Sequence, residues 1–195
     1  MRKKEGDKQT AILDAAVQVF QREGFAGAQV AAVAVEAGIA TGSVYLYFKG
    51  KDAILDGVFE RFWCKVLERI EGLPATEPKD QLADQLGAFF DSLSEDRALA
   101  EVYLHEHHSF LARKSGVGFD AFARCVSLGE EVFSRGVKSG QFDKGISVSL
   151  GRAFVFGGVR ASLEFWLSQD SLSAAQVRKR TLRMALSALT PRGLA

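Results

Sequence analysis

Proline, cysteine and long apolar runs are all scarce in this sequence of 195 residues. The only prolines are Pro74, Pro78 and Pro191, so two long stretches lack the residue that most strongly interrupts helices. Cys64 and Cys125 have no partner at metal-binding or redox spacing, which favours buried, reduced thiols. No run approaches the roughly 20 apolar residues that span a bilayer, and the polar start lacks the apolar region of a signal peptide. We therefore expect a cytoplasmic protein without membrane contact.

The sequence also lacks the residue patterns of an enzyme. It shows no paired nucleophile and base and no glycine-rich phosphate loop, so we expect no catalytic residues, no cofactor and no metal. Glu101, His105 and His108 share one helical face and form a candidate metal site, but three ligands on one helix seldom converge on one ion. A wet helix face, or a place in a ligand pocket, is the alternative for these residues.

Charge carries little information in this chain, whose formal net charge is +1. One basic cluster precedes the first apolar pattern and consists of Arg2, Lys3, Lys4 and Lys8. This cluster either reaches phosphates of a nucleic acid or is a solvated terminus, and the sequence favours neither interpretation.

Apolar residues repeat at helical spacing through most of the chain, and alternation typical of strands is nowhere sustained. The first pattern ends at Gly24, a residue that commonly stops helices. An all-α fold follows from this pattern. The expected helices cover residues 7–23, 30–37, a short segment from about Thr41, and residues 52–71, 79–93, 96–113, 117–139, 147–168 and 173–189.

Residues 30–48 have the pattern of a helix-turn-helix, in which two short helices flank a glycine turn. Gly38 is placed to adopt the left-handed conformation that turns the chain sharply. In the second helix, Val44 and Phe48 stand four residues apart and are expected to face inward. Gly42 leaves room for a close approach of the backbone to DNA.

With its flanks, this segment resembles the DNA-binding head of TetR-type repressors. The resemblance implies an N-terminal three-helix helix-turn-helix domain, residues 1–51, and a C-terminal helical domain for ligand binding and dimerisation, residues 52–195. The matching residues are Gly24-Phe25, Val30, Val33-Ala34, Ala37-Gly38-Ile39, Gly42-Ser43-Val44-Tyr45, Tyr47-Phe48, Lys51 and Leu55.

The resemblance implies that polar side chains of the second helix meet operator bases and phosphates in the major groove, and that Lys51 holds a phosphate. Two departures concern the helix caps. Ala28-Gln29 stands where the family usually has a Ser or Thr before the first helix of the motif. We therefore expect Gln29 or a neighbouring backbone group to cap that helix instead. Ala40-Thr41 replaces the usual Ser before the second, which makes Thr41 the expected cap. The predicted DNA contacts are Gln29, Thr41, Gly42, Ser43, Tyr45, Tyr47, Lys49 and Lys51.

A looser resemblance covers most of the chain and points to the repressors of fatty-acid degradation of bacilli and thermophiles. It rests on the run from Gly42 to Leu55, on Leu99-Ala100 with Val102 and Glu106, and on Phe156-Gly157-Gly158 with Phe165-Trp166. It implies an effector, long-chain acyl-CoA, that releases the protein from DNA. The candidate ligand residues are Phe89, Phe90, His105, His108, Arg113, Phe122, Arg124, Phe133, Phe154 and Arg160.

The family resemblance also implies a homodimer, formed through residues 147–189, on a palindromic double-stranded operator. Small residues in this range, including Gly157 and Gly158, let helices approach closely. Two alternatives remain open at this point. One is a drug- or antiseptic-sensing repressor of an efflux gene with the same fold, and the other is a helical lipid-binding protein or enzyme.

Overall fold

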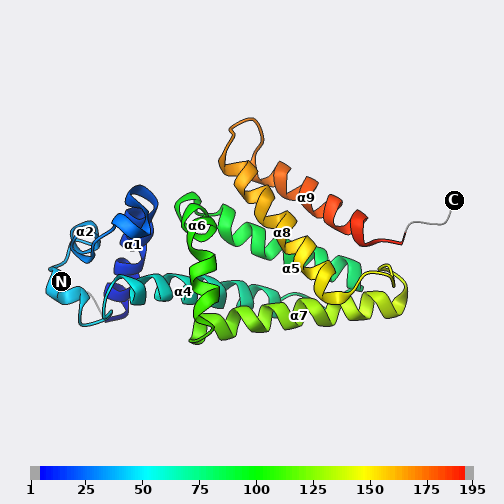
Figure 1. The fold of residues 1–195 in the computed structure, drawn as a ribbon, viewed down its shortest axis with the longest axis horizontal. Coiled ribbons are helices and arrows are strands. Elements are labelled where there is room, and N and C mark those ends of the chain that lie inside the picture. Colours follow the sequence, from blue (N-terminus) through cyan, green and yellow to red (C-terminus); the bar gives the residue numbers. More distant parts are fainter. Residues whose placement is uncertain (1–4, 192–195) are drawn as a thin grey trace. The chain divides into compact units, whose positions relative to one another are not determined.

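The computed structural model describes residues 5–191, and every regular element in that range is a helix. The predicted all-α fold is confirmed. None of these helices is both long and apolar enough to cross a membrane. The helices, drawn in Figure 1, are α1 (Glu5–Gly27), α2 (Val30–Glu36), α3 (Thr41–Val44), α4 (Lys51–Glu71), α5 (Pro78–Ser94), α6 (Arg97–Arg113), α7 (Val117–Ser139), α8 (Val148–Leu167) and α9 (Ala174–Leu189).

The helices pack into two compact units. Unit 1 comprises Met1–Trp63 and Asp96–Asp120, and unit 2 comprises Cys64–Glu95 and Ala121–Ala195. The boundaries fall inside α4 and α7, so α6 belongs to unit 1 together with α1, α2 and α3. The division by packing therefore differs from the functional division predicted after residue 51, which stays a prediction.

Unit 1 is built around α1 and an aromatic cluster. The apolar face of α1, with Ile12 and Phe20, is buried, and α1 packs against both α2 and α6. In the cluster the rings of Phe59 and Phe110 stack with their centroids 4.8 Å apart, and Tyr103 lies 6.0 Å from Phe59. Burial of such rings from α4 and α6 contributes a large part of the hydrophobic stabilisation of this unit.

Unit 2 packs α5 against α8 and α9, and glycines of α7 and α8 make close contacts with buried rings. A Cβ atom added to Gly151 in α8 would lie 2.6 Å from Cζ of Phe133, and one added to Gly136 would overlap the ring of Phe142. Because interiors are packed at crystal-like density, Gly151 and Gly136 exclude any larger residue without rearrangement. Gly87 of α5 faces the guanidinium of Arg178 in α9, which is the far end of a flexible side chain and can move aside.

The predicted helices agree with the structure to within about two residues at most ends. Gly24 adopts φ 70° and breaks the regular geometry of α1, and a short helical extension to Gly27 follows it. One detail was wrong. Ala40 is the cap residue of α3 and Thr41 is its first helical residue, with no side chain capping the helix.

Candidate nucleic-acid interface

The turn between α2 and α3 depends on Gly38. Its φ of 67° lies in the left-handed region, as predicted, and a side chain would be strained there. Hydrogen bonds from the amides of Ala37 and Ile39 to the carbonyls of Val33 and Ala34 close the end of α2. The turn therefore fixes where α3 begins.

The second helix of the motif is a single turn, and the segment that follows it carries exposed side chains between two buried ones. Val44 and Phe48 are buried, as their spacing predicted, and the Phe48 amide donates to the Val44 carbonyl over 3.0 Å. Between them, Tyr45 is 55% exposed and Leu46 is 82% exposed. Two buried anchors thus hold a loop of outward-facing side chains.

Neither short helix of the motif has a side-chain cap. Gln29 precedes α2 with extended backbone angles, but its side chain makes no capping hydrogen bond. Of the two expected substitutes for the missing cap, the Gln29 side chain is therefore wrong, whereas a backbone group is present, because the Gln29 carbonyl accepts from the Ala32 amide over 3.0 Å. Because neither helix has a side-chain cap, the packing of Val33, Ala34 and Val44 carries much of the stability of α2 and α3.

Lys51 holds the end of α1 in place. Its ammonium donates to the carbonyls of Phe25, Ala26 and Ala28 over 3.0, 2.8 and 3.4 Å, and it also lies 5.0 Å from the centroid of the Phe25 ring. All three protons of the ammonium have acceptors inside the protein. The predicted contact of Lys51 with a phosphate would require at least one of these bonds to be exchanged.

The other predicted DNA contacts lie at the surface of the same segment. Gly42, Lys49 and Gln29 are exposed, whereas Thr41, Ser43 and Tyr47 are half-buried. A Cβ added at Gly42 would meet no atom within 4 Å, so the backbone is open to an approaching molecule. Leu46 is also exposed but was not among the predicted contacts, although its position between two tyrosines expected to face outward was a signal. Lys8 is half-buried, and Arg2, Lys3 and Lys4 lie outside the described residues.

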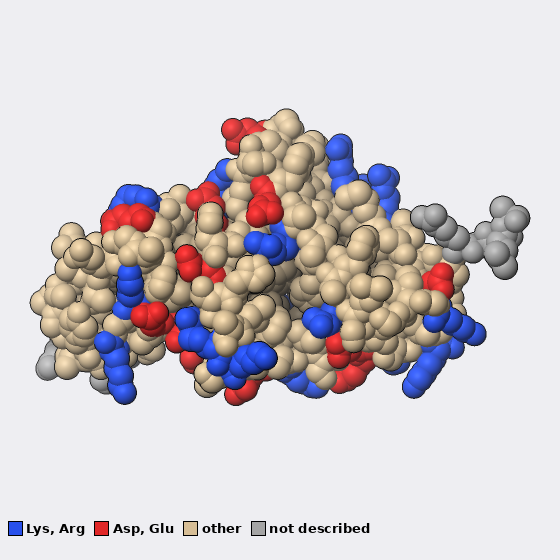
Figure 2. Space-filling view, viewed as in Figure 1, with Lys and Arg blue, Asp and Glu red and all other residues tan. Residues whose placement is uncertain are grey.

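Charge does not single out a nucleic-acid surface on the face drawn in Figure 2, where basic and acidic side chains are interspersed. Several basic groups of unit 1 are held in ion pairs, such as Arg22 with Glu36 at 3.2 Å and Arg61 with Asp14 at 2.7 Å. Hydrogen bonds to Glu23 and Glu36 raise the pKa of Arg22 above its ordinary value. The candidate interface is therefore recognised by its shape and exposed side chains.

The phenylalanines predicted to bind ligand differ widely in exposure. Phe89, Phe90 and Phe133 are buried in unit 2, where Phe89 contacts Phe156 with ring centroids 5.8 Å apart. Phe122 is half-buried, and Phe154 is 60% exposed on α8. Their ligand role stays a prediction, and for Phe154 the structure shows a surface position instead of a core one.

Each arginine predicted near the coenzyme phosphates faces a carboxylate. Arg113 lies 2.6 Å from Asp56 in unit 1, and Arg124 and Arg160 face Glu131 and Glu164 at 3.5 and 3.9 Å in unit 2. The two predicted histidines, His105 and His108, are exposed on α6 in unit 1. A phosphate at any of these arginines would compete with an existing partner.

Within residues 5–191, no group of three or more His, Cys, Asp or Glu side chains is arranged to hold a metal.

Comparison with known proteins agrees with this geometry. Residues 12–58 match the model of the family described as bacterial regulatory proteins, tetR family. The chain is 30% identical over 171 residues to the fatty acid metabolism regulator protein of Bacillus subtilis, covering 86% of this chain and 88% of the relative.

Two solved structures share the fold over nearly the whole chain. The transcriptional regulator FadR from Bacillus subtilis in complex with stearoyl-CoA is 28% identical with a TM-score of 0.77, over 92% of this chain and 98% of that one. The ketosteroid transcriptional regulator KstR2 of Mycobacterium tuberculosis is 22% identical with a TM-score of 0.80, over 97% and 98%. The buried anchors, the glycine turn and these matches lead to one conclusion: the chain belongs to the tetR family of bacterial regulatory proteins.

Proposed function

We propose that this chain is a repressor that binds a palindromic operator as a homodimer and leaves it when long-chain acyl-CoA binds. The observation that carries the DNA-binding part is the burial of Val44 and Phe48 on either side of the exposed Tyr45 and Leu46. Side chains held outward on a fixed short segment have the geometry that base recognition in the major groove requires.

The exposed side chains of this segment suggest complementary roles. The hydroxyl groups of Thr41, Ser43, Tyr45 and Tyr47 can bond to base edges or phosphates, and these residues keep the DNA role predicted from the sequence. Leu46 offers an apolar surface that suits the C5-methyl group of thymine. Lys51 has a positioning role here, because it orders the backbone that leads from α1 to α2.

A second copy of this chain is the proposed partner of α8 and α9. Leu150, Phe154 and Phe165 are 65%, 60% and 51% exposed, and their spacing places them on one face of α8. Gly157, Gly158 and Ala161 share that face, so a partner helix can approach closely. An exposed apolar stripe of this kind is unusual on a monomeric protein and typical of an interface. The range 147–189 therefore keeps its predicted role.

Two findings support an acyl-CoA effector. The relative from Bacillus subtilis is a fatty acid metabolism regulator, and the FadR structure from that organism holds stearoyl-CoA. In this chain, unit 2 supplies buried aromatic side chains on α5 and α7, including Phe90 and Phe133, which suit an acyl chain.

The DNA-binding proposal is tested with operator sequences selected from a random duplex library by the purified wild-type chain. Leu46→Ala and Tyr45→Ala are then compared with Val117→Ala, which changes a side chain on α7 that is 58% exposed. We expect the first two variants to lose about fivefold to a hundredfold in affinity, equal to about 1–3 kcal/mol, with folding unchanged. Replacing operator thymines by uracil should weaken the wild type and leave Leu46→Ala unaffected. Full affinity in both variants would overturn the assignment.

The effector proposal is tested by native mass spectrometry of the purified dimer and by operator release. Stearoyl-CoA should release the operator at micromolar concentration, whereas free CoA should not, because it lacks the acyl chain. A drug-like cation carried by the protein instead of an acyl-CoA would favour the efflux alternative, and operator binding unaffected by acyl-CoA would reject the effector.

A further inference from the structure

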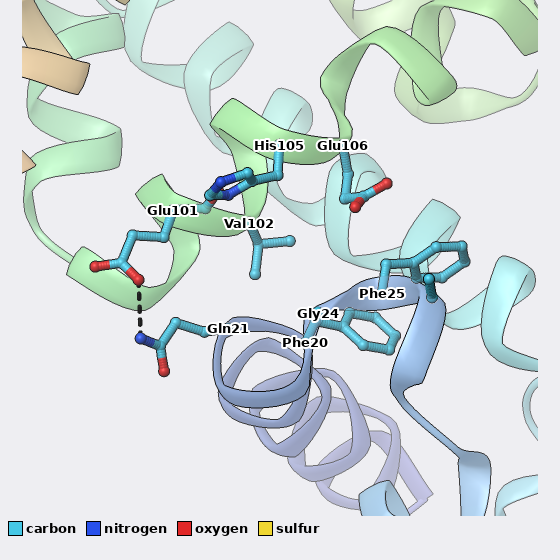
Figure 3. A pocket seen from close by; sticks show the side chains of 9 residues that line it. Phe20, Gln21, Gly24, Phe25, Glu101, Val102, His105 and Glu106 are labelled. Atoms are coloured by element: carbon cyan, nitrogen blue, oxygen red, sulfur yellow. Dashed lines mark hydrogen bonds between the residues drawn. The ribbon is translucent and has the colours of Figure 1, made fainter.

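A hollow of about 340 Å³ opens within unit 1 between the end of α1 and the middle of α6 (Figure 3). Its volume lies at the lower end of the range for small-molecule pockets, which is roughly 300–1,000 Å³. The floor is apolar, and it includes the Val102 side chain and the rings of Phe20 and Phe25, packed edge to face at 5.3 Å. The hollow is therefore large enough for a small molecule with an apolar part.

The polar groups at this hollow are mostly hydrogen-bond acceptors. Glu101 and Glu106 supply carboxylates, and no Lys or Arg lines the hollow. The one side-chain amide, Gln21, already donates to Glu101 over 2.8 Å. The Nδ1 atom of His105 lies 2.7 Å from the Glu101 carbonyl oxygen, which can only accept. In the neutral ring Nδ1 therefore carries the proton, and Nε2 is left as a further acceptor.

The two carboxylates differ in their surroundings. Glu101 is bonded to Gln21 and also faces Nε of Arg97 at 3.5 Å, so its charge is partly compensated. Glu106 is half-buried and makes no hydrogen bond or ion pair with the residues that the structure describes. In Figure 3 the two side chains extend to opposite sides of this stretch of α6, with Val102 between them and Glu106 on the side of Phe25.

The aromatic floor also suits a cation. Phe20 and Phe25 present π systems whose faces carry partial negative charge, which attracts ammonium groups. The Phe25 ring already interacts with the Lys51 ammonium at 5.0 Å, so a cationic ligand needs the negative charge of Glu106 to offset repulsion from that ammonium. An anion would meet two carboxylates here, so this hollow does not suit the phosphates of acyl-CoA.

We propose that this hollow binds an organic ammonium ion with a short apolar chain. The ammonium donates to the carboxylate of Glu106 near Phe25, the chain lies over Phe20 and Val102, and any second donor reaches Glu101 or Nε2 of His105. The ligand class has the opposite charge to acyl-CoA, so the two ligands occupy different sites.

The regulatory consequence rests on the function proposed above. The hollow lies between α1 and α6, which pack against each other in unit 1. Helix α1 also packs against α2, the first helix of the helix-turn-helix. A ligand that fits one arrangement of α1 and α6 better than another shifts the population toward that arrangement. By linkage, the ammonium ligand and the operator then change the affinity of each other.

The binding test uses the full-length chain without DNA. Calorimetric titration with butylammonium, 1,4-diaminobutane and spermidine is compared with 1-butanol and butanoate, which have similar chains without the positive charge. We expect saturable binding for the ammonium compounds and none for butanoate. Glu106→Gln should weaken binding at least tenfold, as expected for loss of a charged hydrogen-bond partner.

Matched variants make the result specific to the hollow. Glu68→Gln removes an exposed carboxylate from α4 in unit 2 and should leave ammonium binding unchanged, and Glu106→Asp should retain part of it. Circular dichroism and the melting temperature confirm that each variant is folded. Equal binding of 1-butanol, or undiminished binding by Glu106→Gln, would overturn the proposal.

A second titration separates this proposal from the proposed function. Operator affinity is measured with and without spermidine, for the wild type and for Glu106→Gln. A change of at least threefold that disappears in the variant supports the coupling, and no change refutes it. If the chain binds ammonium but no operator, the proposed function fails and the site stands. If it binds operator but no ammonium, the site alone fails.

Discussion

The two units of this molecule present different kinds of surface. In unit 1, exposed Tyr45 and Leu46 lie on a short segment whose neighbours Val44 and Phe48 are buried. In unit 2, the exposed apolar side chains form a stripe along α8, and the interior is closed by glycines that contact buried rings. The proposed DNA binding of unit 1 thus depends on the chemistry of a few exposed side chains. The packing of unit 2 depends instead on close fit between helices.

The strongest test of this contrast is Phe154→Glu on α8. The side chain is largely exposed, so the fold of the chain should be unaffected, but a charge buried between two copies opposes association by several kcal/mol. We expect a monomer in analytical ultracentrifugation, and operator affinity reduced by more than a hundredfold, because two heads no longer bind together. Ser149→Glu, on a different face of α8, is the control. A stable Phe154→Glu dimer would show that this face is not the interface.

A second test compares two glycines of α7, one in close contact with a buried ring and one without such a contact. Gly136→Ala places a methyl group against the buried ring of Phe142, and overpacking of this kind should cost about 2–3 kcal/mol of unfolding free energy. Gly129→Ala on the same helix has its nearest neighbour at 3.8 Å and should stabilise the chain by about 0.5–1 kcal/mol. Chemical denaturation measures both changes. Similar effects of the two substitutions would contradict the role of close fit in unit 2.

Lys51→Met decides between the two roles of this lysine in unit 1. Loss of its three hydrogen bonds to carbonyls should lower the free energy of unfolding by about 1–2 kcal/mol. The slope of log affinity for operator against log salt concentration should stay the same. If Lys51 instead holds a phosphate, that slope falls by about one. Lys49→Met, an exposed neighbour, is the comparison.

The smallest expected effect concerns the alkaline stability of unit 2. Burial raises the pKa of the Cys125 thiol from 9.0 to about 12. Above pH 9 the unfolded chain loses this proton and the folded chain keeps it, so stability falls as pH rises toward 12. Between pH 9 and 10.5, Cys125→Ala should therefore lose less stability than the wild type in urea titrations. Parallel curves for the two chains would contradict this.

Sequence patterns were enough to predict those features of the structure that depend on residues close together in the sequence. The positive φ of Gly38, the inward Val44 and Phe48, and most helix ends follow from residue type and helical period, which act over a few positions. Thr41 shows the limit of this reasoning. It has the side chain of a good cap, yet in the structure Ala40 is the cap residue and the helix already begins at Thr41.

Contacts between distant segments could not be predicted in this way. The sequence indicates that Lys51 is basic and stands at a helix start, but not that its ammonium reaches carbonyls 23 to 26 residues away. It shows Phe154 in an apolar helix without telling that the ring lies on the surface. It also does not show that α6 packs on α1 and leaves the hollow near Glu106.

The sequence by itself determined the helices, the glycine turn and the family of this protein, because helical period, turn geometry and spaced motif residues are local properties of the chain. Only the tertiary structure decided which side chains are exposed, which ammonium is already satisfied and where a hollow remains. Those properties arise from packing between segments far apart in sequence, and the energy of that packing depends on shapes that no local pattern contains.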